Sequence, residues 1–225
     1  MTEIFDPFSI MFWVVSAIAL VLALSVHEFC HALAADLLGD PNPRLQGRLT
    51  LNPLKHLDPI GTLSLIFFKF GWGKPVQFDP YNLRHPKRDA ALIALAGPIS
   101  NFIMALLSAL ILRLIFHFNT GAVTMSFLAS SPTPLAFLVS LLLFLITVNI
   151  GLGVFNLVPV PPLDGHWILG ALLPQKTYYA YRQAVRRLGP ALLVVLILPL
   201  FGGQSIISYL ITPVIDFLTN LVMPF

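Results

Sequence analysis

The residues best suited to chemistry in this sequence are two histidines and a glutamate in the run HEFCH at positions 27–31. On a helix, His27 and His31 lie one turn apart on the same face, so their imidazoles can bind one tetrahedral zinc ion while Glu28 serves as a base beside them. Catalytic zinc usually has three protein ligands and a water molecule. The pattern therefore predicts a third ligand elsewhere in the chain, and Asp164 is the candidate.

An alternative interpretation of this run is a pair of structural histidines in a packed core. The residues on both sides of the run are almost all apolar. Histidine and glutamate are costly inside an apolar helix unless they face a partner or a cavity. The location therefore favours a functional site over a chance pair.

The composition is that of an integral membrane protein. Of 225 residues, 57% are hydrophobic and only 10% are charged, whereas a soluble domain has about 25% charged residues. The net charge of +3 could suggest nucleic-acid binding. The basic residues, however, lie in short segments between apolar runs, as in the cytoplasmic loops of membrane proteins, so we expect no nucleic-acid partner.

Three apolar stretches are long enough to cross a bilayer, and three are shorter. The long stretches are Phe8–Val26, whose helix continues to about Leu38, Ala90–Leu112 and Leu135–Leu157. The shorter ones are Ile60–Phe68, Ala191–Phe201 and Ile206–Phe217. We therefore expect an all-α polytopic membrane protein with about five to six transmembrane or re-entrant helical segments around a buried zinc site, with a proline-rich extended segment.

The charges that flank the first span predict its orientation. Acidic residues precede it, and Arg44, Arg48 and Lys55 follow it, which favours a cytoplasmic location for the histidine-bearing end. The first apolar run lacks a basic leader and is expected to be retained. We expect a single domain, 1–225, with a motif-bearing core at about 8–174 and C-terminal helical segments at about 175–225, in a prokaryotic plasma membrane.

A proline-rich stretch, FNLVPVPPLDG, follows the third span at positions 155–165. Its prolines exclude a regular helix, so we expect the chain after Asn156 to be extended and Gly165 to allow a sharp turn. This segment could be a simple loop that ends the helix. A buried Asp164 would need a counter-charge, however, and a zinc ion would supply it.

Other polar residues could support the site or only the fold. In the second span, Pro98 frees a backbone carbonyl, Gly97 allows another helix to come close, and Asn101 places an amide within the bilayer. Such residues are as typical of helix packing as of a site. His56 and His166 could hydrogen-bond residues of the metal site, although a role in loop structure is the simpler interpretation.

Four segments in consistent order carry a resemblance to a known family. HEFCHALAADLLGD, LNPLKHLDPIGT, AGPISN and FNLVPVPPLDG resemble the site-2 protease family of intramembrane zinc metalloproteases, in its short form without a PDZ or nucleotide-binding appendage. The resemblance implies one Zn²⁺ per chain and a role for each matching residue. These are His27, His31 and Asp164 as ligands, Glu28 as catalytic base, and Asn101 and Asn156 close to the active site, where an amide could bind an oxyanion.

We therefore expect a zinc-dependent endopeptidase that cleaves peptide bonds in or near transmembrane segments of membrane proteins. Its partners would be a substrate with a transmembrane helix and the lipid bilayer, and the oligomeric state is left open. Two alternatives are a catalytically silent binder or chaperone with the same fold, and a metal-ion transporter. The intact Glu28 favours the enzyme.

Overall fold

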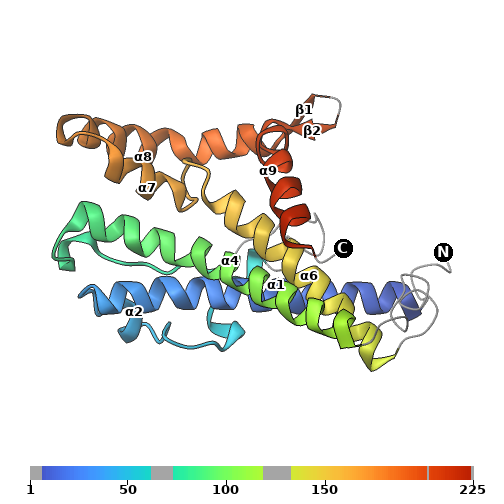
Figure 1. The fold of residues 1–225 in the computed structure, drawn as a ribbon. Coiled ribbons are helices and arrows are strands. Elements are labelled where there is room, and N and C mark those ends of the chain that lie inside the picture. Colours follow the sequence, from blue (N-terminus) through green and yellow to red (C-terminus); the bar gives the residue numbers. More distant parts are fainter. Residues whose placement is uncertain (1–6, 62–72, 119–132, 202, 224–225) are drawn as a thin grey trace.

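Three long helices form the centre of the molecule (Figure 1). The computed structural model describes residues 7–61, 73–118, 133–201 and 203–223. Helices α1 (Pro7–Leu37), α4 (Pro86–Phe118) and α6 (Pro134–Asn156) are each long and apolar enough to cross a membrane. They confirm the three long stretches expected from the sequence.

Helix α4 extends beyond its expected limits at both ends. It begins at Pro86, a residue favoured in the first turn of a helix because its fixed φ suits that turn. It continues to Phe118, six residues beyond the expected end of the span at Leu112. Residues 119–132 lie outside the described residues.

Helices α4 and α6 pack closely because small residues line part of their contact. Ala105 and Ala109 on α4 lie in one cluster with Leu112 and, from α6, Ile146 and Ile150. All five side chains are buried, so this contact excludes both water and lipid. The cluster forms the core between the two spans.

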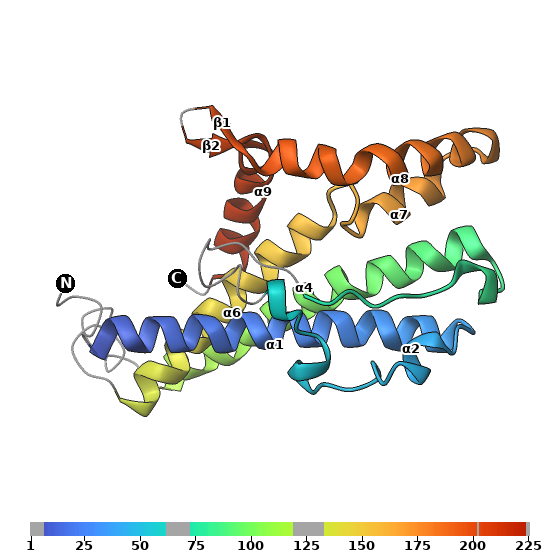
Figure 2. The ribbon, with the colours of Figure 1, turned by 180° about the vertical axis from the view of Figure 1, so that it is seen from behind.

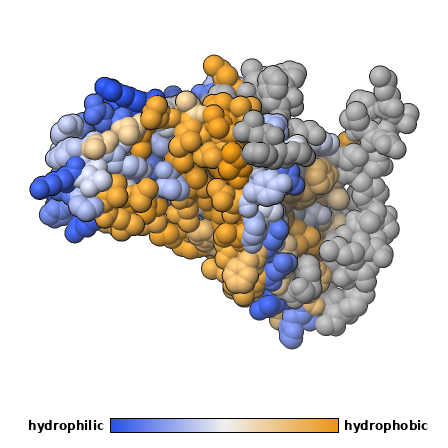
Figure 3. All heavy atoms as spheres, turned by 90° about the horizontal axis from the view of Figure 1, so that it is seen from above, coloured by the Kyte–Doolittle hydropathy of each residue, from blue (hydrophilic) through white to orange (hydrophobic). Residues whose placement is uncertain are grey.

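The outer faces of the spans are apolar as well. About half of the surface of Ile103, Leu107 and Leu110 on α4 is exposed. Figure 3 shows a broad apolar surface over the middle of the molecule, with hydrophilic residues at the end where α4 and α8 begin. An apolar exterior of this extent is suited to contact with lipid.

The chain after α6 contains three more helices and a hairpin. They are α7 (Gly165–Leu172), α8 (Gln175–Ile197), the antiparallel strands β1 (Pro199–Phe201) and β2 (Gln204–Ser205), and α9 (Ile206–Val222). Helix α8 starts well before the apolar run that we expected from residue 191, because its basic first half is also helical. Helix α9 packs on α6 through side chains that include Ile211 and Ile215.

These elements confirm an all-α membrane fold, with one short hairpin in the described chain. Helices α1, α4 and α6 meet the length and hydropathy of a span, and α9 is a shorter apolar helix. Most of the short apolar stretch Ile60–Phe68, expected to be re-entrant or a short tilted helix, lies outside the described residues. The total of five to six segments and the single-domain division therefore stay predictions.

The proline-rich segment at 157–164 is not helical, as expected, but it is folded into turns rather than extended. Val160 N donates to Val158 O at 2.8 Å, and Leu163 N donates to Val160 O at 3.0 Å. Gly165 starts α7, and a Cβ at this position would lie 2.2 Å from the backbone oxygen of Leu157. Glycine is needed there because α7 begins against the end of α6, not because the chain turns sharply.

The connector after α1 contains short helical turns that the sequence did not predict. They are α2 (Asn42–Leu45) and the 3₁₀ turns η2 (Pro53–Lys55) and η3 (Pro80–Asn82). The buried guanidinium of Arg48 donates to the backbone oxygens of Lys55 and Pro75. This contact ties the connector to the segment that precedes α4.

Asp40, just beyond the end of α1, binds the same segment. Its side chain is fully buried and accepts hydrogen bonds from Asn42 N at 3.1 Å, Asp79 N at 2.7 Å and Asn82 Nδ2 at 2.8 Å. The carboxylate satisfies three donors that would otherwise lack a partner. It holds residues 79–82 at the end of α1.

Replacement of Asp40 by alanine should destabilise the protein by about 3 kcal/mol, because three donors lose a charged acceptor. A lowered midpoint of thermal unfolding in detergent would show this. Asp216→Ala on α9 is the control, since Asp216 is exposed. Equal midpoints for the two variants would contradict the role assigned to Asp40.

Candidate metal centre

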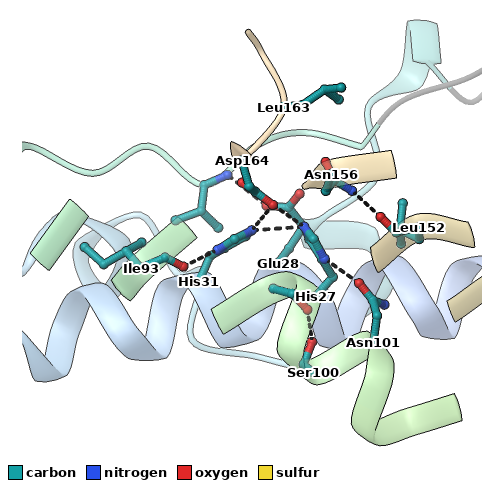
Figure 4. Close-up of polar contacts among 12 residues, drawn as sticks. His27, Glu28, His31, Ile93, Ser100, Asn101, Leu152, Asn156, Leu163 and Asp164 are labelled. Atoms are coloured by element: carbon teal, nitrogen blue, oxygen red, sulfur yellow. Dashed lines mark hydrogen bonds and ion pairs between the residues drawn. The ribbon is translucent and has the colours of Figure 1, made fainter. Parts of the chain in front are cut away.

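Three side chains, two from α1 and one from the residue before α7, converge at one point (Figure 4). The Nε2 atoms of His27 and His31 lie 2.9 Å apart. The Oδ2 atom of Asp164 lies 3.3 Å from the first and 3.2 Å from the second. Both histidines are buried, so the three atoms enclose a small, largely dry site.

The hydrogen bonds behind the imidazoles define which ring nitrogens carry protons. His27 Nδ1 lies 2.6 Å from Asn101 Oδ1, and His31 Nδ1 lies 2.7 Å from the backbone oxygen of Ile93. Both oxygens can only accept, so both Nδ1 atoms are donors. In the neutral rings, each Nε2 therefore directs a lone pair at the carboxylate of Asp164.

This arrangement fits a zinc ion. Two nitrogen lone pairs and a carboxylate oxygen at 2.9–3.3 Å repel one another unless a cation lies among them. Within the described part of the chain, the buried Oδ2 of Asp164 accepts no hydrogen bond. Tetrahedral zinc with ligand distances of about 2.1 Å would place its ligands about 3.4 Å apart, close to the separations observed.

The charge state of Asp164 suits the same role. Burial raises the pKa of this carboxyl group, but the nearby imidazoles of His31 and His27, when protonated, lower it by more. Its pKa therefore lies well below the usual value for aspartate, and the group is an anion at neutral pH. A divalent cation is bound best by such an ionised oxygen.

Helix α4 is shaped to lie against the two imidazoles. A Cβ on Gly97 would lie 2.4 Å from His31 Nε2 and 2.6 Å from His27 Cε1, so only glycine leaves room for both rings. Pro98 frees the backbone carbonyl of Ala94, as expected, but His31 bonds the neighbouring carbonyl, that of Ile93. The AGP sequence thus serves the site as well as helix packing.

Glu28 lies beside the cluster without being part of it. Among the residues that the structure describes, the cluster of possible ligands contains His27, His31 and Asp164 only. Glu28 is buried, and its Oε2 accepts a hydrogen bond from Val76 N at 2.9 Å. Val76 belongs to the segment held by Arg48 and Asp40, so the connector orients this carboxylate.

The structure places the two asparagines differently. Asn101 is fully buried behind His27, and its Nδ2 donates to Asn149 Oδ1 at 2.8 Å and to Ala23 O at 3.4 Å. Asn156 lies at the end of α6 near Asp164 (Figure 4), where its Nδ2 donates to Leu152 O at 3.0 Å. Only Asn101 therefore contacts a member of the cluster.

The two other predicted histidines contact backbone rather than the cluster. His166 Nδ1 lies 2.6 Å from Leu163 O, and burial lowers the pKa of this histidine. Its neutral ring donates to the residue just before Asp164 and so braces the turn. His56 Nε2 lies 2.7 Å from Thr50 O, and the backbone oxygen of His56 accepts from Lys74 N, so His56 holds the connector.

Three contacts of the site were not found in the sequence. Val76 and Ile93 act through backbone atoms, which carry no residue-specific signal. Asn149, which bonds Asn101, did have such a signal, because it is an amide in the middle of the largely apolar helix α6. A search for isolated polar residues within predicted spans would have identified it.

The sequence matches the profile of peptidase family M50 over residues 15–198. YwhC of Bacillus subtilis, named a "putative zinc metalloprotease", is 37% identical over 171 residues, which cover 76% of this chain and 74% of YwhC. Rip2 of Mycobacterium tuberculosis strain H37Rv, named in the same way, is 30% identical over 81% of this chain and 66% of its own. The zinc metalloprotease MJ0392 of Methanocaldococcus jannaschii is 27% identical over 90% of this chain and 47% of its own. No solved structure matches the chain.

Replacement of Gly97 by alanine should weaken zinc binding roughly 30-fold, because the new methyl group displaces both imidazoles at a cost of about 2 kcal/mol. Competition with a zinc chelator measures the affinity. Gly151→Ala is the matched control, since a Cβ at this helical glycine would have no neighbour within 4 Å. Unchanged affinity in Gly97→Ala would show that α4 does not confine the rings.

Proposed function

Because the chain belongs to peptidase family M50, we propose that it cleaves peptide bonds in or near the transmembrane segments of membrane proteins. It is a zinc metalloprotease and an integral membrane protein. The observation that carries the proposal is the convergence of His27, His31 and Asp164 beside Glu28 on a membrane-length helix. Cleavage within the bilayer and the residue roles below are the proposed part.

His27, His31 and Asp164 are the three protein ligands of one zinc ion. This donor set leaves a fourth position for water or substrate, as at other catalytic zinc sites. When bound, zinc activates water and polarises the carbonyl of the peptide bond to be cleaved. The two Nδ1 hydrogen bonds hold the imidazoles in the orientation that binding requires.

Glu28 is the general base. Its Oε2 is held by Val76 N–H, which leaves the carboxylate oriented and able to take the proton of the attacking water. The same group then delivers that proton to the nitrogen of the leaving amine. A buried carboxylate suits this task, since little bulk water competes for the proton.

The two asparagines have separate roles. Both N–H groups of the Asn101 side chain are directed at protein acceptors, Asn149 and Ala23, so Asn101 supports His27. Asn156 has one amide N–H beyond its bond to Leu152. It is the candidate donor for the oxyanion that forms during hydrolysis.

The position of the site along α1 favours a substrate that lies within the membrane. His27 is ten residues before the end of α1 at Leu37, or about 15 Å along the helix axis. A transmembrane helix hides its carbonyls in hydrogen bonds, so the substrate must be unwound locally before its peptide bond reaches Glu28. The partner is a membrane protein with a transmembrane helix.

The charges support a location of the site nearer the cytoplasmic side of a prokaryotic plasma membrane. Exposed basic residues, among them Arg44 and Arg88, lie at the end of the spans closer to His27. Basic residues mark the cytoplasmic ends of spans. The relatives come from bacteria and an archaeon, which supports the same membrane type.

Replacement of Glu28 by glutamine should reduce cleavage of a membrane substrate by about a thousandfold, because the base is lost while the zinc ligands remain. Cleavage by the purified protein in liposomes and its zinc content measure the two effects. Asp36→Asn is the control, since Asp36 is an acidic residue on the same helix that pairs with Arg44. A Glu28→Gln variant that cleaves at the wild-type rate would disprove the proposed base.

Chelation should remove both the zinc and the activity, and added zinc should restore both.

Asp164→Ala should bind far less than one zinc ion per chain after gel filtration, because two imidazoles alone bind zinc weakly. Metal analysis of the purified protein measures the ratio. One tightly held zinc ion in Asp164→Ala would rule out this residue as the third ligand.

A further inference from the structure

Asn149 is a buried amide in the middle of α6 that the proposed mechanism leaves unused. Its side chain is fully buried in a 23-residue helix that is otherwise almost entirely apolar. An uncompensated amide at such a depth would be costly. Asn149 is compensated on both sides, since its Nδ2 donates to Leu145 O at 2.8 Å and its Oδ1 accepts from Asn101.

Asn101 extends this contact to the metal centre. Its Nδ2 donates to Asn149 Oδ1, and its Oδ1 lies 2.6 Å from His27 Nδ1. The chain of bonds therefore runs from α6 through α4 to α1. All three side chains are buried, so no bulk water is available to replace any link.

The donor and the acceptor of every hydrogen bond in this series follow from the bond at its α6 end. The backbone oxygen of Leu145 can only accept, so the atom of Asn149 beside it must be the amide nitrogen. Asn149 then presents its oxygen to Asn101, which must answer with its own nitrogen. Asn101 is left with an oxygen facing His27 Nδ1, which must carry the proton.

We propose that Asn149 is a positioning residue for His27, acting through Asn101 to keep the lone pair of His27 Nε2 directed at the zinc position. The inference rests on the proposed role of His27 as a zinc ligand. Without Asn149, the Asn101 amide loses its shorter bond, and only the 3.4 Å contact with Ala23 O is left to hold it in one orientation. A rotated amide would present N–H to His27 Nδ1 and favour the tautomer whose Nε2 carries a proton and cannot bind metal.

A purely structural role is the competing explanation, because asparagines often join helices within membranes. That role and the positioning role differ in what they change. Lost helix contacts lower the stability of the metal-free protein and leave the intrinsic zinc affinity unaltered. A loosened His27 lowers the zinc affinity even where the metal-free protein remains folded.

The test is zinc affinity in Asn149→Leu, measured by chelator competition at a temperature where the metal-free variant is folded. Leucine is close to asparagine in size and suits an apolar helix, so the fold should be retained. We expect the zinc affinity to fall 10- to 100-fold, the range typical for loss of a group that holds a metal ligand. Asn149→Ser is the second variant, for use if the leucine variant does not fold. Serine keeps a hydroxyl but is too short to hold Asn101, so its zinc affinity should fall about tenfold.

Thr147→Val on the same helix is the matched control. Thr147 also donates to a backbone oxygen four residues earlier, at 3.1 Å, but its side chain is exposed, whereas that of Asn149 is buried. Its zinc affinity should equal that of the wild type. Adding Asn149→Leu to Asn101→Leu should cause no further loss of affinity, because the two residues act in series.

Zinc affinity within twofold of the wild type in Asn149→Leu would overturn the inference, whatever happens to thermal stability. So would additive losses in the double variant. Neither result depends on peptidase activity. A wild-type protein that binds zinc but cleaves no membrane substrate would instead contradict the proposed function and leave the inference on Asn149 standing.

Discussion

The structure depends on the convergence of two imidazole nitrogens and one carboxylate oxygen, 2.9–3.3 Å apart, inside an apolar molecule. Without a cation, these atoms repel one another, and in this environment the repulsion is poorly screened. The surrounding elements must therefore hold the three atoms together against their own electrostatics. This requirement explains why hydrogen bonds from neighbouring residues hold both imidazoles and the turn that carries Asp164.

Each of the three spans contributes to that support in a different way. Helix α1 provides both imidazoles, and α4 bonds the Nδ1 atoms of both through Asn101 and the backbone of Ile93. Helix α6 holds Asn101 through Asn149, and the turns that follow it present Asp164. Because α4 packs directly against the two imidazoles of α1, it needs a residue without a side chain at that contact, and Gly97 is that residue.

The connector between α1 and α4 orients Glu28. The proposed base must lie close to the metal site without being a ligand, and Glu28 is held beside the cluster by the N–H group of Val76. Asp40 and Arg48 hold the segment around Val76 against the end of α1. Charged residues buried in the connector, which runs beside α1 (Figure 2), thus serve the geometry inside the metal centre. The apolar exterior of the spans is suited to contact with lipid (Figure 3).

Much of this could be inferred from the sequence, because the signals are local. The three long apolar stretches follow from hydropathy, and the pairing of His27 with His31 follows from the helical repeat. Asp164 was identified because an ionised group after a proline-rich stretch in a membrane protein needs a counter-charge. The family and the zinc dependence followed from the same short motifs and agree with the relatives.

Only the tertiary structure decided how distant segments meet. The 3.2 Å separation between His31 and Asp164 depends on how the helices pack, which no local pattern encodes. The same holds for Gly165, whose role is set by the backbone of Leu157, and for Asn149, whose partner lies 48 positions away. The sequence thus determined which residues can do the chemistry, whereas the packing of α1, α4 and α6 determined their distances and proton positions, since these depend on contacts between residues far apart in the chain.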